Sequence, residues 1–123
     1  MAETAKIAIV DDDQDIREAI TTLVETVGLR AEGFASAEEF LSSPQAQDSA
    51  CLLLDVRMPG MSGFELQRQL GAANWRIPII FITAYADDDV RARALAAGAV
   101  AVLSKPCHEA ELLQAIEVAL TQS

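Results

Sequence analysis

The sequence predicts an α/β fold: a doubly wound, five-stranded parallel sheet covered by helices on both faces. Short apolar runs alternate with helical patterns along the whole chain, which is typical of this class. The third and fourth runs are apolar at nearly every position, as buried parallel strands require. With 123 residues, of which 51% are hydrophobic, the chain can bury one core. We therefore expect a single domain over residues 1–123.

Five apolar runs are the expected strands. They span residues 6–10, 30–34, 51–55, 77–83 and 99–103, and turn or helix signals bound them. Short connections between parallel strands imply right-handed crossovers. In such a sheet the ligand site lies beyond the carboxyl ends of the strands, so the residues at those ends are the first candidates for function.

The segments between the strands carry helical patterns. Ile16, Ile20, Leu23 and Val27 recur at helical spacing, and Gly28 predicts the end of the first helix. For the second helix, a capping box of Ser36 and Glu39 predicts the start and Pro44 the end, and Leu66 and Leu70 mark the third helix. The acids at 87–89 predict the start of the fourth helix and Gly98 its end. The fifth helix is predicted from its apolar positions, which are Leu112, Leu113, Ile116 and Leu120.

Composition excludes several classes of function. Acids outnumber bases 19 to 9, giving a net charge of -10, and the basic residues are scattered along the sequence, so we expect no direct binding to nucleic acid. Cys51 and Cys107 lack metal-ligand spacing and fit a reducing compartment. The sequence has no stretch of membrane-spanning length and no leader pattern. We expect a cytoplasmic protein without membrane contact.

Polar residues follow four of the five expected strands. Clustered carboxylates repel one another unless a divalent cation binds, and Mg²⁺ prefers oxygen ligands. A carboxylate that faces this ion can attack phosphorus and form an aspartyl phosphate, with a lysine and a hydroxyl contacting the phosphoryl oxygens. The residues concerned are Asp11, Asp12 and Asp13 after the first strand, Asp55 at the end of the third, Thr83 at the end of the fourth, and Lys105 with Pro106 after the fifth. We assign the acceptor role to Asp55.

The acidic run after the first strand also fits part of a calcium-binding loop. Asp11, Asp13 and Asp15 match the first, third and fifth positions of the EF-hand pattern, but Ile16 replaces its glycine and Thr22 its final glutamate. Capping of the first helix is the alternative role for Asp13 and Asp15.

Two phosphate-related alternatives are also weaker than an acceptor aspartate. A phosphatase of the haloacid dehalogenase type carries a D-x-D motif, with a second aspartate two residues after the first. Here the residue two positions after Asp55 is Arg57, so the second acid is missing. A flavodoxin-like sheet would bind flavin phosphate through small hydroxyl residues after the first strand, where this chain has acids. Each of the other site residues, taken singly, has an ordinary alternative role. Lys105 could be a solvated surface lysine, Thr83 a hydroxyl at a strand end, and Pro106 a residue that stiffens a loop.

Four blocks of this sequence resemble bacterial response-regulator receiver domains. They are "IAIVDDD", "CLLLDVRMPGMSGFEL", "PIIFITAYAD" and "AGAVAVLSKP", in the order and spacing of that family. The blocks "FASAEEFL" and "LLLDVRMPGMSG" are most similar to its FixJ-type branch. The resemblance implies a CheY-like fold with strand order 2-1-3-4-5.

The resemblance also implies roles for the matching residues. Asp55 would be the phospho-acceptor, Asp12 a direct Mg²⁺ ligand, Asp11 an acid acting on the metal through water, and Arg57 a ligand through its backbone carbonyl. The site would accept and hold a phosphoryl group, with self-phosphorylation and autodephosphorylation as its only catalysis, so we do not expect an enzyme.

Five further residues concern the switch. Thr83 and Lys105 resemble the switch hydroxyl and the phosphate-binding lysine of the family, and the peptide bond before Pro106 is expected in cis. Val102 departs from the family pattern, which usually has Tyr or Phe there as a rotameric switch coupled to the threonine. Tyr85, two residues beyond Thr83, is a candidate for gating water and so setting the lifetime of the phosphate.

Partners follow from the same resemblance. A sensor histidine kinase or a phosphotransfer protein would donate the phosphoryl group, docking beside the first helix. Phosphorylation would shift the face made by the fourth helix, fifth strand and fifth helix, which also offers a homodimer contact. The expected output is transcription regulation through a helix-turn-helix domain outside this chain. The competing hypothesis is a stand-alone receiver or pseudo-receiver that binds partners without phosphorylation.

Overall fold

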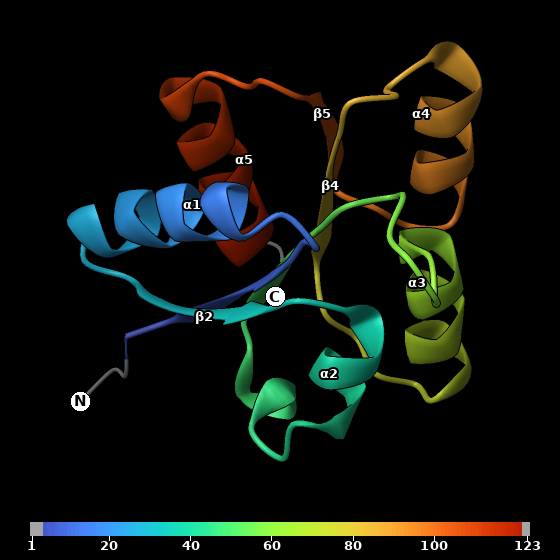
Figure 1. The fold of residues 1–123 in the computed structure, drawn as a ribbon, viewed down its shortest axis with the longest axis horizontal. Coiled ribbons are helices and arrows are strands. Elements are labelled where there is room, and N and C mark those ends of the chain that lie inside the picture. The colour runs from blue at the N-terminus through green and yellow to red at the C-terminus, as the bar shows by residue number, and fades with distance from the viewer. Residues whose placement is uncertain (1–3, 122–123) are drawn as a thin grey trace.

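The five expected strands form one parallel sheet in the order β2-β1-β3-β4-β5 (Figure 1). The computed structural model describes residues 4–121 of the chain. Its strands are β1 (Lys6–Val10), β2 (Arg30–Phe34), β3 (Cys51–Leu54), β4 (Ile79–Thr83) and β5 (Ala101–Ser104). The predicted fold class and strand order are confirmed.

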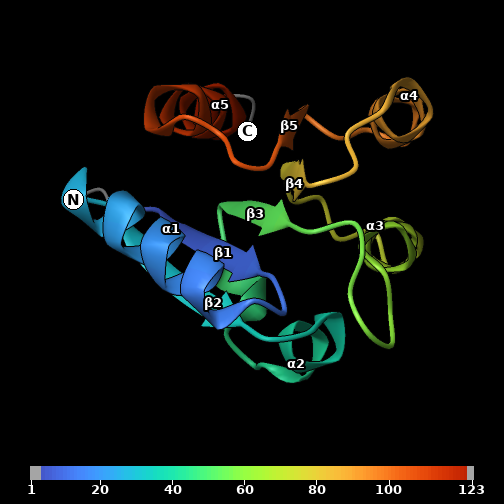
Figure 2. The ribbon, with the colours of Figure 1, turned by 45° about the horizontal axis from the view of Figure 1, so that its top comes forward.

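Five helices cover the two faces of the sheet. They are α1 (Gln14–Thr26), α2 (Ala37–Ser42), α3 (Gly63–Ala72), α4 (Asp88–Ala96) and α5 (Glu109–Thr121), and a short 3-10 helix, η1 (Ala46–Asp48), precedes β3. Helices α1 and α5 lie on one face, and α2, α3 and α4 lie on the other (Figure 2). Among residues 4–121, no helix combines the length and the apolar character needed to cross a membrane.

The sheet separates two apolar cores. Alternate residues of β3 point to opposite faces, so Leu52 packs with α2, α3 and α4, whereas Leu53 packs with α1 and α5. Phe40 anchors the first core: its ring meets Phe34 edge-on at 5.3 Å between centroids and stacks on Trp75 at 5.4 Å. All the residues of β1, β3 and β4 are buried, which explains the unbroken apolar runs in the sequence.

Three strands begin or end differently from the prediction. Strand β4 begins at Ile79, two residues late, because Pro78 has no amide hydrogen to give to the sheet. Strand β3 ends at Leu54, so Asp55 lies just beyond it, although its amide still donates to the Val10 carbonyl at 3.1 Å. Strand β5 begins at Ala101 because the Ala99 amide, beyond the end of α4, still donates to the Ala94 carbonyl of that helix at 3.0 Å.

Caps fix both ends of α1. The Asp13 carboxylate accepts hydrogen bonds from the amides of Asp15 (2.9 Å) and Ile16 (3.3 Å), which confirms its capping role. Gly28 ends the helix at a φ of 90°, a left-handed conformation that favours glycine. Val27 was expected in the buried stripe, but it is the C-cap residue and is 49% exposed, because the chain leaves the core one residue before the glycine.

Side chains also cap the first turns of α2, α3 and α4. Asp87 caps α4 through the Val90 amide at 2.9 Å, as the run of acids indicated. The Ser36 hydroxyl caps α2, but Glu39 bonds to the Ala35 amide, so that capping box is displaced by one residue. A complete capping box, not predicted above, lies at the start of α3, where Ser62 and Glu65 bond to each other's amides.

Candidate functional site

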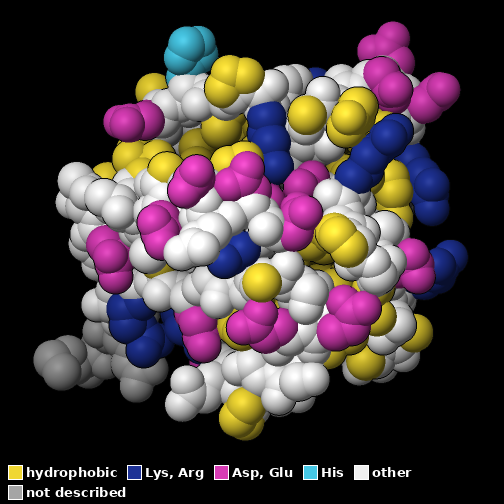
Figure 3. Space-filling model, viewed as in Figure 1, with side chains coloured by type: hydrophobic (Ala, Val, Ile, Leu, Met, Phe, Trp, Pro, Cys, Tyr) yellow, Lys and Arg dark blue, Asp and Glu magenta, His cyan; other side chains and the backbone are white. Residues whose placement is uncertain are grey.

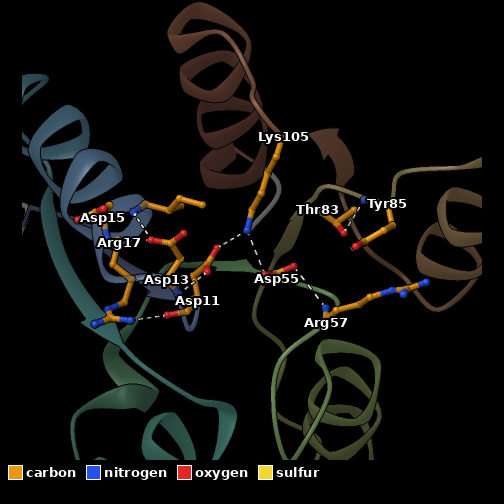
Figure 4. Close-up of polar contacts among 10 residues, drawn as sticks. Asp11, Asp13, Asp15, Arg17, Asp55, Arg57, Thr83, Tyr85 and Lys105 are labelled. Carbon is orange, nitrogen blue, oxygen red and sulfur yellow. Dashed lines mark hydrogen bonds and ion pairs between the residues drawn. The ribbon is translucent and has the colours of Figure 1, made fainter.

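The polar residues that follow the strands meet at one edge of the sheet. Asp11 follows β1, Asp55 follows β3, Thr83 ends β4, and Lys105 follows β5. Figure 4 shows the Lys105 side chain reaching from its loop toward the space between Asp11 and Asp55. The convergence expected from parallel topology is therefore present, between residues up to 94 positions apart in the sequence.

Three carboxylates form the centre of this site. Asp11, Asp12 and Asp55 each place one carboxylate oxygen within 4.8 Å of the others. Asp11 and Asp55 are only 3% and 7% exposed, whereas Asp12 is open to solvent. Two of the acids are thus desolvated, and the third leaves the cluster accessible from outside.

Lys105 partly balances this charge. Its Nζ donates to Asp11 Oδ2 at 2.7 Å and to Asp55 Oδ2 at 3.0 Å, so a single ammonium links the ends of β1, β3 and β5. Three negative charges against one positive charge leave the group with a formal charge of -2. That residual charge matches one divalent cation.

Burial and charge act in opposite directions on the pKa values here. Burial raises the pKa of Asp55 above its ordinary value, and the hydrogen bond and charge of Lys105 only partly oppose the rise. Burial also acts to lower the pKa of Lys105, but hydrogen bonds and charges from Asp11 and Asp55 outweigh it, so its pKa is raised. Lys105 therefore remains a cation at neutral pH, and ionised Asp55 lacks a full set of compensating positive charges.

Backbone contacts hold the two buried acids in place. Asp11 Oδ1 accepts from the Asp13 amide at 2.9 Å, and the Asp11 carbonyl accepts from Arg17 Nη1 at 2.7 Å. Asp55 Oδ1 accepts from the Arg57 amide at 3.3 Å. Asp13 therefore has two roles, as the cap of α1 and as a support for Asp11. Arg17 was not expected to contribute, and nothing in the sequence signals its role beyond its position one turn into α1.

A glycine lies directly behind the acceptor candidate. A Cβ added to Gly63 would collide with the Asp55 carbonyl oxygen and lie 3.0 Å from the Phe81 ring. The Gly63 amide donates to the Val56 carbonyl at 2.9 Å, which closes the loop between β3 and α3. The start of α3 therefore approaches the Asp55 backbone so closely that only glycine fits there.

Thr83, Tyr85 and Arg57 form the opposite side of the site. Thr83 is fully buried, and its Oγ1 accepts from the Tyr85 amide at 3.1 Å. The Lys105 amide donates to the Thr83 carbonyl at 2.9 Å, which ties the lysine loop to β4. The Arg57 guanidinium lies 4.0 Å from the centroid of the Tyr85 ring, a cation–π contact visible beside Asp55 in Figure 4. The Tyr85 side chain is 53% exposed.

Val102 occupies a core position, where the resembling family usually has an aromatic ring. It is 3% exposed and packs in the core beneath α2, α3 and α4. Its carbonyl accepts from Arg91 Nη1 at 2.8 Å, so a side chain of α4 is bonded to the backbone of β5. The Lys105–Pro106 peptide bond is cis, as expected.

The two cysteines have ordinary structural surroundings. Cys51 is buried, and burial raises the pKa of its thiol to about 12, which fits the predicted core role. Cys107 is partly buried beside Pro106, and both thiols are free.

The donor set of this site fits Mg²⁺. Asp11, Asp12 and Asp55 offer oxygen ligands, which this ion prefers, and the exposed position of Asp12 leaves room for the water ligands that it retains. The formal charge of -2 points the same way. The site can therefore hold a divalent cation beside a nucleophilic carboxylate.

The fold and site together define a class of protein: a parallel α/β domain with strand order 2-1-3-4-5 that holds three acids and a lysine at its carboxyl edge. The chain matches the response regulator receiver domain family over residues 7–117, and it belongs to that family. It is thus a receiver domain of two-component signalling rather than a conventional enzyme.

Known relatives agree with this assignment. The chain is 47% identical to the response regulator protein TodT of Pseudomonas putida over 114 residues, which cover 93% of this chain and 50% of TodT. It is 34% identical to the transcriptional regulatory protein FixJ of Azorhizobium caulinodans over 123 residues, which cover 58% of FixJ. The crystal structure of FixJ-N is 35% identical and superimposes with a TM-score of 0.88, covering 99% of this chain and 98% of that one. The chain spans about half the length of these curated relatives.

Proposed function

We propose that Asp55 accepts a phosphoryl group from a phosphohistidine of a sensor histidine kinase or a phosphotransfer protein. The observation that carries this proposal is the placement of a buried, nucleophilic carboxylate 3.0 Å from Lys105 Nζ, inside a cluster of three acids. A purely structural ion pair would not need the second and third acid, because they leave negative charge uncompensated.

The transfer needs few protein groups. An oxygen of Asp55 attacks phosphorus, the new P–O bond forms as the P–N bond breaks, and the departing imidazole nitrogen keeps the electron pair and takes up a proton as required. The Lys105 ammonium can stay close to the phosphoryl oxygens as a point charge. The Thr83 oxygen accepts the Tyr85 amide, so its hydroxyl hydrogen is free to bond to a phosphoryl oxygen.

Asp11, Asp12, Asp55 and the backbone carbonyl of Arg57 would hold Mg²⁺. When bound, this ion supplies positive charge that offsets the charge on the phosphoryl oxygens. The contact between the Arg57 amide and Asp55 Oδ1 fixes the loop that carries the Arg57 carbonyl. The Asp13 amide and Lys105 Nζ hold the two carboxylate oxygens of Asp11, and Arg17 holds its backbone carbonyl, so the carboxylate needs little reorganisation.

Acetyl phosphate tests the acceptor role without the unknown kinase. The protein is incubated with acetyl phosphate in Mg²⁺ or in EDTA, and the intact mass is recorded. We expect a mass increase of one phosphoryl group in Mg²⁺ only. Borohydride reduces an acyl phosphate to an alcohol, so peptide mass spectrometry after reduction should locate the modification at residue 55. A modification at another acid, or none in Mg²⁺, would show that this assignment is wrong and would favour a phosphorylation-independent interaction module.

Mg²⁺ is expected to stabilise the fold even without a phosphoryl donor. A ligand that binds only the folded state at 100 times its dissociation constant adds about 2.7 kcal/mol to the free energy of unfolding. Thermal unfolding in EDTA and in increasing Mg²⁺ measures this effect. Asp12→Asn removes one negative charge from the cluster and should reduce the stabilisation by Mg²⁺. Asp48→Asn, at an exposed acid of η1, is the control and should leave that stabilisation unchanged. Equal melting temperatures with and without Mg²⁺ would rule out a cation at this cluster.

For the full-length protein we propose an output in transcription regulation, through a helix-turn-helix domain outside this chain. TodT is named a response regulator and FixJ a transcriptional regulatory protein, which supports the proposal. The face made by α4, β5 and α5 is the candidate homodimer contact and output surface. The bond from Arg91 to the Val102 carbonyl couples α4 to β5 within it. The two free cysteines suit a cytoplasmic location.

Tyr85 is proposed to control water access to the phosphorylated acceptor. Its ring is exposed and held by the Arg57 guanidinium beside Asp55, so it is positioned to shield one side of the site.

A further inference from the structure

A groove runs between α3 and α4, away from the acid cluster. It consists of two adjoining hollows of about 550 and 320 Å³ that share Gln67, Gly71 and Ala97 as lining residues. We call it the α3–α4 groove. The larger hollow includes residues 77–79, at the amino end of β4, and Asp55 lies beyond the carboxyl end of the neighbouring strand. The groove and the acceptor site are therefore at opposite edges of the sheet.

The groove combines an apolar floor with basic walls. In the larger hollow, Leu70, Ile77 and Trp75 provide the apolar surface, and its volume lies within the range of about 300–1,000 Å³ that is typical of pockets for a compact ligand group. Arg76 lines this hollow, and Arg68 and Arg93 line the smaller one. Figure 3 shows several basic side chains along the side of the molecule that α3 and α4 form, with acidic side chains above and between them.

Within the part of the chain that the structure describes, these three arginines have no acidic partner of their own. The ion pairs among residues 4–121 involve only Lys6 and Lys105, although the chain has 19 acids for 9 bases. Among residues 4–121 no arginine pairs with a carboxylate, so what distinguishes Arg68, Arg76 and Arg93 is that all three line one groove. Unpaired, exposed arginines beside an apolar hollow offer planar donors that match carboxylates bidentately.

The walls of the groove are held in position. Gln67 is buried, and its Nε2 donates to the Ala94 carbonyl at 3.3 Å, which links α3 to α4. The Arg93 guanidinium lies 4.2 Å from the centroid of the Phe64 ring. Gly71 and Gly98 line the hollows without side chains, and a Cβ added to either would meet nothing within 4 Å. The groove is thus open and largely pre-formed, which lowers the entropy cost of binding.

We propose that the α3–α4 groove binds an acidic segment of another polypeptide, with one bulky apolar side chain in the larger hollow and flanking carboxylates on Arg68, Arg76 and Arg93. Charge complementarity selects this partner, because an acidic segment meets positive charge here and repulsion elsewhere on a chain of net charge -10. A nucleic acid is disfavoured because its extended charge would also meet the surrounding acids. The proposal does not depend on phosphorylation of Asp55.

Trp75 makes the test direct, because it is the only tryptophan of the chain and lines the larger hollow. The probes are capped peptides with three glutamates on each side of a central leucine, isoleucine or phenylalanine, and the same peptides with glutamine in place of glutamate. We expect at least one acidic peptide to change the Trp75 emission saturably, with a dissociation constant below about 1 mM that rises with salt. Calorimetry provides an independent measure of the same binding.

Substitutions in the groove locate the site. Arg68→Gln, Arg76→Gln and Arg93→Gln should each weaken binding about two- to five-fold, the effect expected for a solvent-exposed ion pair. Gly71→Leu places a side chain in the open hollow and should weaken it more than about ten-fold, without a clash in the free protein. Arg30→Gln, at an exposed arginine of the β2 edge strand, is the matched control and should leave binding unchanged.

Several results would overturn the proposal. These are the absence of saturable binding by every acidic peptide below about 1 mM, equal binding by the glutamine peptides, or equal losses in the groove variants and in Arg30→Gln. A duplex DNA oligonucleotide that shifts the Trp75 emission when the acidic peptides do not would assign the groove to nucleic acid instead. Each variant is first shown by circular dichroism to fold.

Discussion

The Asp55→Asn variant is expected to gain no phosphoryl group from acetyl phosphate in Mg²⁺, a complete loss of the reaction. An amide has no nucleophilic oxygen of comparable reactivity, and the substitution keeps the size and shape of the side chain. The fold should therefore persist while the acceptor is lost. Intact mass under the conditions that modify the wild-type protein measures this, and a full adduct on the variant would show that the phosphoryl group goes elsewhere.

The same variant is expected to be more stable than the wild-type protein in EDTA at neutral pH, by about 1 kcal/mol. Burial raises the pKa of Asp55 in the folded state, so ionisation of this group disfavours the folded state relative to the unfolded one. The stability linked to this group is complete below its unfolded pKa and is lost as the pH rises through the folded pKa. The advantage of Asn over Asp should thus grow from mildly acidic to neutral pH.

Urea unfolding at several pH values in EDTA measures that advantage. Asp48→Asn removes an exposed acid and should show no comparable, pH-dependent gain. An Asp55→Asn variant that is less stable than the wild-type protein throughout this range would mean that the bond to Lys105 outweighs the desolvation of Asp55. Mg²⁺ should reduce the difference in stability between Asp55→Asn and the wild-type protein, because the ion stabilises the ionised carboxylates of the wild-type cluster.

Gly63→Ala is expected to be strongly destabilising, with a loss of about 3 kcal/mol or more in the free energy of unfolding. The new Cβ would overlap the Asp55 carbonyl oxygen, and backbone on both sides leaves neither group free to rotate away. Relief requires the start of α3 or the loop after β3 to move. Because that loop carries Asp55 and Arg57, phosphorylation should also slow in whatever fraction of the protein folds.

Gly71→Ala is the matched control, because it adds the same methyl group to the same helix. A Cβ at this position would have no neighbouring atom within 4 Å, so the substitution should stabilise the protein by about 0.5–1 kcal/mol through helix propensity. Urea unfolding of both variants measures the contrast. Similar effects at the two sites would show that the close approach of Gly63 to Asp55 is unimportant in solution.

Strand-end residues were the most predictable part of the site. Short apolar runs in the sequence predicted the positions of β1, β3, β4 and β5. In a parallel sheet the carboxyl ends of these strands share one edge, which brings together the residues that follow them, Asp11, Asp55, Thr83 and Lys105. The hydrogen bonds from Lys105 to Asp11 and Asp55 follow from that convergence. Sequence pattern succeeds here because the alternation of strands and helices fixes which ends share an edge.

Features that depend on contacts between elements were less predictable. The capping box of Ser62 and Glu65 was visible in the sequence as Ser-x-x-Glu and was overlooked. The role of Gly63 was not visible, because it depends on how closely α3 approaches the end of β3. The basic residues appeared scattered along the chain, yet packing of α3 beside α4 brings Arg68 and Arg93 to one groove.

The division of the core by the sheet has a consequence for folding during synthesis. The layer beneath α2, α3 and α4 can close on the ribosome before the last helix is made, because those helices precede β5 in the chain. The opposite layer, which includes Ile9, Leu53 and Ile80, has only α1 as cover until α5 emerges. A nascent chain that pauses before Glu109 therefore exposes one apolar side of the sheet, which makes this interval the most vulnerable to aggregation and the most suited to chaperone binding.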